Sequence, residues 1–352
     1  MKILHITESF GGGVTSAINS YILNSQQHEH YLLASVRKGD TTGEEGNGLF
    51  KHMELVPRRL TSLVRVKPYI DRVQPDVIHL HSTYAGALIR ALPFIPAQKI
   101  VYTPHGFAFL RGDHPMMLKA YRTIESLLAR RTAVIAGCGL DEQRIAGELI
   151  EPGSTLGLVN VCDELPNVPA IRSLTSKPVI GMVGRISRQK GYDYFRNVAD
   201  ACRNVAHFKW IGGGDIQAMA ELERAGIEVT GWRPRNEVVA HMKGLDLYFH
   251  SAAWDGFPIS VLEAAKLGLP IALRRIGPFI AENLTTADDM DNACRQITAF
   301  VKGDPETRYA LNQNSQNIQN LHSGEYLQAS LESLYSRFNQ RLDGKRLVMS
   351  GS

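Results

Sequence analysis

Cysteine is scarce in this sequence, and long apolar runs are missing. The 352 residues include four cysteines, which are far apart and form no C-x-x-C pair, so a disulfide framework and a zinc site of paired cysteines are excluded. No apolar run approaches the roughly 20 residues that a membrane span requires. The chain starts with MKILHITESF and enters a strand pattern at once, so we expect no signal peptide. We therefore expect a cytoplasmic protein, located at the inner face of the plasma membrane if it contacts lipid.

A large excess of charge of either sign is also missing. Lysine and arginine number 39 against 35 aspartates and glutamates, and the net charge is +4. This small positive excess suits anionic ligands or an anionic membrane, and it is too weak to indicate nucleic acid as a partner. The G-x-G-x-x-G pattern of dinucleotide-binding proteins is absent too, which makes a dehydrogenase the least favoured enzyme class.

The sequence does contain a regular alternation of short apolar runs and segments of helical period. Such alternation predicts parallel sheets with helices on both faces, and here it occurs twice. We expect an α/β protein of two Rossmann-like domains facing each other across a cleft. The predicted strands are 2–7, 31–36, 77–81, 99–103 and 133–137, then 179–183, 207–211, 227–230, 246–250 and 269–273; helical period is clearest over 14–25, 115–131, 191–204 and 235–243.

A stretch with three prolines and little periodicity, 163–178, separates the two series of strands and reads as a linker. We therefore predict a first domain over 1–165, a linker over 166–178 and a second domain over 179–322. A last helix, within 323–343, is expected to cross back and pack on the first domain.

Ligands of open α/β sheets bind beyond the carboxyl ends of the strands, so the residues after each predicted strand are the candidates. Gly11, Gly12 and Gly13 follow the first strand and open a helix, which suits an anion, although a tight turn explains them equally well. His105 follows strand 99–103 between a proline and a glycine, and we favour a functional role for it. His79 is interpreted as structural, and the role of His81 stays open.

Two cations beside glycines follow the first strand of the second domain. Arg185 comes after Gly184, and Lys190 precedes Gly191, so the pair is suited to bind a diphosphate and to stabilise it as a leaving group. The alternative is two solvated surface charges. Two further strand ends carry Gly213 and Trp232, which would line a nucleobase pocket; a buried tryptophan in a loop is the competing interpretation.

Two acids stand beside the next loop. Asp255 lies in the turn WDGFP, where a sugar hydroxyl would reach it, and Glu263 lies in the mostly apolar helix 258–267 that follows. Pro258 suits the first turn of that helix, and free N–H groups near Phe257, Ile259 and Ser260 would suit phosphate. Glu263 either accepts hydrogen bonds from a ribose diol or forms an exposed pair with Lys266.

This combination resembles the retaining glycosyltransferases of family 4, which have the GT-B fold, over nearly the whole chain and most closely over 179–273. The family's acid-x7-acid motif reads Asp255 to Glu263 here, and its Gly-Arg-x4-Lys-Gly motif reads Gly184 to Gly191. Segment 103–111, TPHGFAFLR, resembles bacterial surface-polysaccharide members. Two departures are an aspartate as the first acid, where glutamate is usual, and a loop 274–284 without the Gly-Gly-x-x-Glu often found there.

The resemblance implies an enzyme that transfers a sugar, with retention, from a UDP- or GDP-linked donor to a saccharide or a lipid-linked saccharide, in bacterial polysaccharide or lipopolysaccharide synthesis. It implies His105, Arg185, Lys190 and Asp255 as catalytic residues, and the residues Gly12, Gly13, Gly213, Trp232, Phe257, Pro258, Ile259 and Glu263 as donor-binding residues. Glu263 would bind the donor ribose and Asp255 the donor sugar.

No metal or cofactor is expected, because the nucleotide sugar is a substrate and the family needs no metal. The sequence Asp289-Met290-Asp291 imitates a metal-binding D-x-D, but we interpret it as a helix start. Two alternatives to a transferase are a sugar-nucleotide epimerase of the same fold and a non-catalytic nucleotide-sugar-binding subunit.

A basic and apolar segment, 57–69, carries the remaining prediction. Arg58, Arg59, Arg65 and Lys67 alternate there with leucines and valines, which suits peripheral contact with an anionic membrane. An ordinary amphipathic helix is the competing interpretation.

Overall fold

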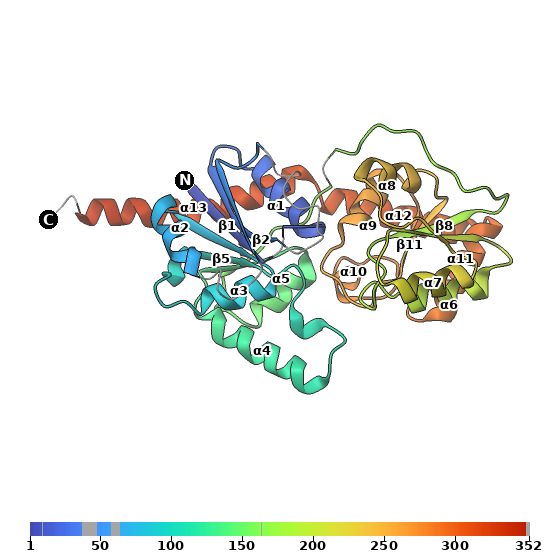
Figure 1. Cartoon of the computed structure of the whole chain (residues 1–352), viewed down its shortest axis with the longest axis horizontal. Helices are drawn as coiled ribbons and strands as arrows, with labels where there is room; N and C mark the ends of the chain where they lie inside the picture. Colours follow the sequence, from blue (N-terminus) through green and yellow to red (C-terminus); the bar gives the residue numbers. More distant parts are fainter. Residues whose placement is uncertain (9, 37–47, 58–63, 163, 350–352) are drawn as a thin grey trace. The chain divides into compact units, whose positions relative to one another are not determined.

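The computed structural model describes residues 1–349 except 9, 37–47, 58–63 and 163, with side chains up to residue 339. The chain divides into two compact units, one formed by Met1–Val161 with Gly324–Ser352 and the other by Cys162–Ser323. Both termini belong to the first unit, because the last helix returns to it (Figure 1).

The first unit contains a seven-stranded parallel sheet in the order β3-β2-β1-β4-β5-β6-β7. Its strands are β1 (Lys2–Thr7), β2 (Glu29–Val36), β3 (His52–Pro57), β4 (Val77–His81), β5 (Ile100–Thr103), β6 (Val134–Gly137) and β7 (Thr155–Gly157). Its helices are α1 (Gly13–Leu23), α2 (Val66–Val73), α3 (Thr83–Arg90), α4 (Pro115–Ala129), α5 (Leu140–Gly147) and α13 (Gly324–Met349).

Alternate residues of the first sheet enter two separate cores. Leu4 of β1 and Leu80 of β4 face a core with residues of α2, α3, α4 and α5. Ile3 faces the opposite core, which includes Tyr21 of α1 and five residues of α13, Leu327, Leu331, Leu334, Tyr335 and Phe338. The period-two pattern of a strand therefore buries both faces of the sheet, and α13 covers one of them.

The second unit contains a five-stranded parallel sheet in the order β10-β9-β8-β11-β12. Its strands are β8 (Val179–Val183), β9 (His207–Ile211), β10 (Glu228–Val229), β11 (Leu247–His250) and β12 (Ile271–Leu273). Its helices are α6 (Tyr192–Cys202), α7 (Ile216–Arg224), α8 (Arg235–Met242), α9 (Ile259–Lys266), α10 (Gly277–Ala281), α11 (Met290–Lys302) and α12 (Pro305–Leu321). One core faces α6, α7 and α11, and the other faces α8, α9 and α12.

The prediction of two parallel α/β domains is confirmed, and all ten predicted strands are present, with every end within two residues of its predicted position. Two strands, β3 and β7, were not predicted. Both lie at the edges of the sheet, and β3 is largely exposed, so neither carries the apolar pattern of a buried strand.

Residues 164–178 contain no helix or strand, but hydrogen bonds attach them to the second unit. The Ile171 N–H donates to the Ala240 carbonyl at 2.8 Å, and Lys243 Nζ donates to the Val168 carbonyl at 2.8 Å. The segment therefore packs along α8 and belongs to the second unit.

The described residues include no helix with the length and apolar content needed to cross a bilayer. Residues 58–63 of the predicted membrane segment lie outside the described residues. Of the remainder, Val66 and Tyr69 are buried in the core against the sheet, so the apolar side of α2 is already covered.

Candidate active site

Two loops at the carboxyl ends of neighbouring strands β8 and β11 are joined through their backbones. Gly191, the N-cap of α6, has φ 64°, and a Cβ there would collide with the Ser251 carbonyl oxygen. The Ala253 N–H donates to the Gln189 carbonyl at 2.9 Å, and Ser251 Oγ donates to the Lys190 carbonyl at 2.9 Å. Glycine alone combines a left-handed φ with this close approach. The two loops are thus held together, with Lys190 at their contact.

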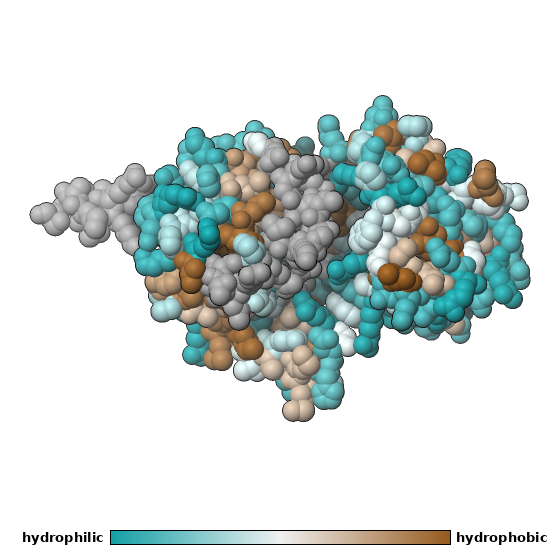
Figure 2. Space-filling model, viewed as in Figure 1, coloured by the Kyte–Doolittle hydropathy of each residue, from teal (hydrophilic) through white to brown (hydrophobic). Residues whose placement is uncertain are grey.

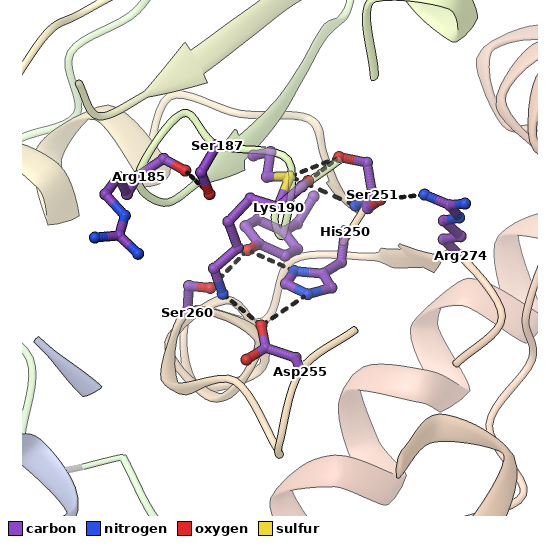
Figure 3. A network of polar contacts seen from close by, with 10 residues as sticks. Arg185, Ser187, Lys190, His250, Ser251, Asp255, Ser260 and Arg274 are labelled. Atoms are coloured by element: carbon purple, nitrogen blue, oxygen red, sulfur yellow. Dashed lines mark hydrogen bonds and ion pairs between the residues drawn. The ribbon is translucent and has the colours of Figure 1, made fainter. Parts of the chain in front are cut away.

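The Lys190 ammonium group forms an ion pair with the Asp255 carboxylate, from the loop after β11 (Figure 3). The buried His250, the last residue of β11, places Nε2 3.6 Å from the same carboxylate oxygen. Its Nδ1 lies 3.4 Å from the Tyr248 hydroxyl, which donates to Ser260 Oγ at 2.9 Å. A continuous polar network therefore joins the β8 loop, the end of β11 and the first turn of α9.

Asp255 stays ionised over the whole neutral range. Burial by itself would raise the pKa of its carboxyl group, but the positive charge of Lys190 and the nearby His250 more than offset burial and lower the pKa to about 2. Burial also lowers the pKa of His250, with Asp255 opposing this effect. At neutral pH Asp255 can only accept hydrogen bonds, so it is unsuited to act as a general acid.

Arg185, the other predicted cation of the clamp, lies two residues beyond β8. Ser187 Oγ donates to its carbonyl at 3.3 Å, while its exposed guanidinium group makes no hydrogen bond or ion pair within the described part of the chain (Figure 3). Lys190 and Arg185 therefore share no partner among the described residues. Their joint binding of a diphosphate stays a prediction.

The N-terminus of α9 points its first N–H groups away from the helix. Pro258 is the N-cap, and its carbonyl accepts from the Val261 N–H at 3.0 Å, while the N–H groups of Ile259 and Ser260 donate to no residue that the structure describes. The ring of Phe257 is buried and lies 3.9 Å, centre to centre, from the His322 ring. Phe257 thus anchors the turn in the core through its ring.

Glu263, the second acid, is 6% exposed and projects from the middle of α9. Its Oε1 lies 3.1 Å from Nη1 of Arg235, the first residue of α8. Lys266 Nζ donates to the Cys162 carbonyl at 3.2 Å. The alternative of an exposed Glu263–Lys266 pair is therefore wrong, because the Glu263 side chain is only 8% exposed.

Gly213 and Trp232 lie in contact beyond β9 and β10. A Cβ at Gly213 would be 2.7 Å from the Trp232 ring, so the indole packs on the glycine backbone. The tryptophan is 69% exposed, which rules out the interpretation of a buried loop tryptophan. An exposed indole ring that is supported by the Gly213 backbone is suited to stack with a planar ring of a ligand.

In the first unit, His105 occupies a strained turn after β5. Its φ is 51°, a left-handed conformation that costs a residue other than glycine about 1–2 kcal/mol. The buried Glu142 carboxylate accepts from the Gly106 N–H at 2.6 Å and from the Cys138 N–H at 2.8 Å, which ties the turn to β6. Burial raises the pKa of Glu142 and lowers that of His105 to about 4. The imidazole is therefore neutral at pH 7.

His105 is joined to a group of histidines that the sequence did not mark as a unit. Its Nε2 lies 3.1 Å from His81 Nδ1, and His81 Nε2 lies 3.0 Å from His5 Nδ1. His79 instead contacts Thr103 Oγ1 at 2.8 Å. The signal was present as His5 on β1 and as His79 and His81 at alternate positions of β4, but it has meaning only once the strand order is known.

Gly12 and Gly13 lie at the start of α1, with Gly12 at φ 59° as the N-cap. Both are exposed, and a Cβ at Gly12 would meet open space. The left-handed φ accounts for Gly12 by itself. The tight turn is thus observed, and anion binding by these glycines stays a prediction.

Asp289 is the N-cap of α11, and its side chain accepts from the Asn292 N–H at 2.7 Å. Asp291 follows in the first turn of the same helix. The prediction that this D-x-D begins a helix is confirmed.

Comparison with known families identifies the protein family of the chain. Residues 177–302 match the model of Glycosyl transferases group 1, and residues 18–146 match that of Glycosyltransferase Family 4. The chain is a glycosyltransferase of the GT-B fold. Arg185, Lys190, Asp255 and Glu263 all fall within the first of these matches, and His105 falls within the second.

Two curated relatives of the glycosyltransferase are bacterial. An uncharacterized 41.2 kDa protein in the cps region of Klebsiella pneumoniae is 27% identical over 309 residues, 81% of this chain and 85% of that protein. The UDP-Gal:alpha-D-GlcNAc-diphosphoundecaprenol alpha-1,3-galactosyltransferase of Escherichia coli is 26% identical over 258 residues, 65% of each chain.

Among solved structures, the fold of the glycosyltransferase is similar to that of Anabaena HepE in complex with UDP-glucose. The TM-score is 0.72 at 15% identity, over 96% of this chain and 99% of HepE. At this identity the likeness concerns the fold alone. Neither the curated relatives nor the solved structures favour an epimerase.

Proposed function

We propose that this glycosyltransferase moves a sugar, with retention at the anomeric carbon, from a nucleoside-diphosphate donor to a saccharide or lipid-linked saccharide acceptor. The nucleotide we propose is UDP, with GDP as the second choice, because the similarly folded HepE binds UDP-glucose. No metal or cofactor is required in this proposal.

The observation that carries the proposal is the joined pair of loops that holds Lys190 beside Asp255 at the carboxyl ends of β8 and β11. This edge of a parallel sheet is where ligands of such folds bind. A cation, an ionised acid and the free N–H groups of α9 gather there, which together suit a diphosphate linked to a hydroxyl-rich sugar.

Each group has a proposed role in holding the donor. Lys190, the unpaired Arg185 and the N–H groups of Ile259 and Ser260 bind the diphosphate. Asp255 accepts hydrogen bonds from sugar hydroxyls, because its low pKa keeps the carboxylate ionised. Glu263 accepts hydrogen bonds from the ribose diol and would exchange its contact with Arg235 for the ligand. Gly213 and Trp232 form the wall for the base.

In the proposed reaction, the bond between the anomeric carbon and the diphosphate oxygen breaks, and the acceptor oxygen bonds to that carbon on the same face. The acceptor proton passes to the leaving diphosphate oxygen. Lys190 and Arg185 stabilise the negative charge that grows on the diphosphate. His105 is neutral and contacts the reacting sugar through a hydrogen bond, and Gly12 and Gly13 border the donor.

The acceptor class is proposed from the relatives. The Escherichia coli relative is named for an acceptor carried on diphosphoundecaprenol, and the Klebsiella pneumoniae relative is encoded in the cps region. A lipid-linked saccharide of bacterial surface-polysaccharide or lipopolysaccharide synthesis is therefore the acceptor we propose for this chain.

A lipid-linked acceptor requires a site at the membrane surface, and we propose peripheral contact with anionic lipid. Segment 57–69 was the predicted contact, but the exposed apolar residues of the first unit gather on α4. Met116 is 75% and Leu127 is 60% exposed, with Met117 and Ile124 between them. Apolar side chains lie over α4 at the lower edge of this unit in Figure 2. Exposed Lys119 on the same helix complements anionic lipid.

A thermal-shift panel of UDP-, GDP-, ADP- and dTDP-sugars tests the donor, because a ligand that binds the native state raises the melting temperature by mass action. We expect a UDP-sugar to give the largest shift, and we expect Arg185→Ala with Lys190→Ala to abolish it. An NMR assay of the product anomer then tests retention. Isomerisation of the donor without an acceptor would instead identify an epimerase.

A further inference from the structure

Four histidines in the first unit form an unbroken chain of hydrogen bonds that ends at His105. His30 Nδ1 lies 3.0 Å from His5 Nε2, and His5 Nδ1 lies 3.0 Å from His81 Nε2. His81 Nδ1 lies 3.1 Å from His105 Nε2. Each of the two central rings uses one nitrogen toward each neighbour, so the rings are linked head to tail.

The parallel sheet explains why these rings meet. His30 lies on β2, His5 on β1, His81 on β4 and His105 just after β5, which is the order β2-β1-β4-β5 of the strands in the sheet. Because residues at alternate positions share a face, His5 lies on the same face of β1 as Ile3, which packs against α1 and α13. The chain of rings therefore crosses the sheet one strand at a time, beneath these helices.

One end of this chain has a fixed hydrogen-bond direction. His30 Nε2 lies 3.1 Å from the carbonyl oxygen of Ser25, which can only accept, and 3.2 Å from Ser25 Oγ. That hydroxyl already donates to the Tyr21 carbonyl at 2.5 Å, so it too is an acceptor for His30. His30 Nε2 must therefore carry a proton, since the opposite tautomer would face two oxygen lone pairs.

The direction then passes from ring to ring. A neutral imidazole has one N–H, so protonation of His30 at Nε2 leaves its Nδ1 as an acceptor for the His5 Nε2–H. In the same way His5 Nδ1 accepts from His81, and His81 Nδ1 accepts from the His105 Nε2–H. His105 Nδ1 is left unprotonated, and it has no partner among the residues that the structure describes.

All four rings are neutral at pH 7, as this sequence of donors requires. Burial lowers the pKa of His30 and of His105 to about 4 each. It lowers the pKa values of His5 and His81 well below the usual value, and their histidine neighbours lower them further.

We propose that His30, His5 and His81 are positioning residues that hold His105 as the Nε2–H tautomer, so that its Nδ1 lone pair accepts a hydrogen bond from a substrate hydroxyl. The inference rests on the proposed function for the identity of that hydroxyl as one of the sugar donor or acceptor. The tautomer itself rests only on hydrogen bonds within the protein.

A bound metal ion is the competing explanation of the cluster, because nitrogens of His5, His79 and His81 lie within 4.8 Å of one another. The His5 and His81 nitrogens that face each other are at hydrogen-bond distance, and a shared proton occupies the lone pair that an ion would need. The hydrogen-bonded chain thus explains the geometry without an ion.

The decisive experiment reads the tautomer directly. In protein labelled with 15N-histidine, two-bond proton–nitrogen correlations distinguish the protonated nitrogen of each ring from the unprotonated one, and the His105→Gln spectrum assigns His105. We expect His105 Nε2–H with an unprotonated Nδ1 in the wild type. A His105 ring protonated at Nδ1, or a stoichiometric metal ion in the purified protein, would overturn the proposal.

Two matched variants separate positioning from general packing. His5→Phe removes the middle link, and His79→Phe removes a fully buried histidine of the same cluster that is outside the chain. We expect His5→Phe to give a mixture of His105 tautomers and to lower kcat about fivefold with an unchanged KM for the donor, as loss of one neutral hydrogen bond would. His79→Phe should keep the wild-type tautomer and kcat.

The wild-type spectrum keeps the proposal testable even if His5→Phe does not fold. Equal losses of kcat in the two variants, with the tautomer unchanged, would contradict positioning. A protein with the expected tautomer that transfers no sugar would contradict the proposed function and leave the tautomer assignment standing.

Discussion

The Lys190 ammonium group is ion-paired with the Asp255 carboxylate, although the two residues are 65 positions apart and were assigned to different halves of the donor. The side chains are 18% and 14% exposed, so the pair is only partly screened by water. The acid therefore neutralises a cation to which we assign contact with the diphosphate. With the roles we propose for the two residues, this pairing would couple sugar recognition to diphosphate binding, and it changes what a substitution at Asp255 should do.

We expect Asp255→Asn to bind UDP about fivefold more tightly than the wild type while losing most of its transfer activity. The amide no longer competes for Lys190, and a partly buried ion pair contributes on the order of 1 kcal/mol. The amide also loses the negative charge that accepts hydrogen bonds from the sugar. Calorimetry with UDP and a transfer assay measure the two effects, and weaker UDP binding would contradict the coupling.

Glu263→Gln should weaken UDP and the intact UDP-sugar alike, because both carry the ribose. Loss of a hydrogen bond to a charged group lowers affinity about tenfold or more. Lys266→Gln is the matched control, since Lys266 is exposed on the same helix and should bind both ligands as the wild type does. A Glu263→Gln variant that binds UDP normally would remove Glu263 from the ribose site.

Gly191→Ala should cost about 3 kcal/mol or more of unfolding free energy, because the new Cβ must displace the Ser251 backbone as well as adopt a left-handed φ. Gly226→Ala is the control. Its φ is 76°, but a Cβ there meets nothing within 4 Å, so we expect a loss of about 1 kcal/mol. Chemical denaturation measures both variants, and similar losses would show that the loop contact adds no stability.

The buried histidines should make the enzyme sensitive to mild acid. The pKa of His30 is lowered to about 4 and that of His79 to about 3 in the folded state, chiefly by burial, against about 6.5 unfolded. The unfolded chain therefore binds more protons below pH 6.5, so stability is complete above that value and falls as the pH drops toward 4. Each of these two histidines should lower the free energy of unfolding by about 2 kcal/mol as the pH falls from 7 to 5.

Denaturant titrations at a series of pH values test this expectation. Asp255, with a pKa of about 2, contributes only below about pH 4 and does not enter this window. A His30→Phe variant should show a shallower decline between pH 7 and pH 5 than the wild type. Equal slopes for the two proteins would mean that His30 is charged in the folded state.

Replacing Met116 and Leu127 of α4 by glutamate should abolish flotation with vesicles that contain anionic lipid, since both apolar burial and charge attraction are lost. Ile216→Glu, at a residue 83% exposed on α7 of the other unit, is the control and should float as the wild type does. If the wild type does not float, the membrane contact is absent.

The sequence by itself determined the architecture and marked the residues of the proposed donor site. Apolar residues at period two and period 3.6 are dictated by burial within each element, so β1, β8 and α9 could be predicted from local pattern. Glycines and cations after the strands marked the loops to which we assign ligand binding, because the carboxyl edge of a parallel sheet is defined by chain direction alone.

Tertiary structure decided which of these residues became partners. The pairing of Lys190 with Asp255 and of Glu263 with Arg235 depends on how separate loops and helices approach each other, which local periodicity does not encode. The histidine chain required the order β2-β1-β4-β5, and His30 joins it only because β2 begins two residues before its predicted start. A sequence pattern reports burial one residue at a time, whereas a hydrogen-bond partner is a property of two distant positions brought together by the sheet.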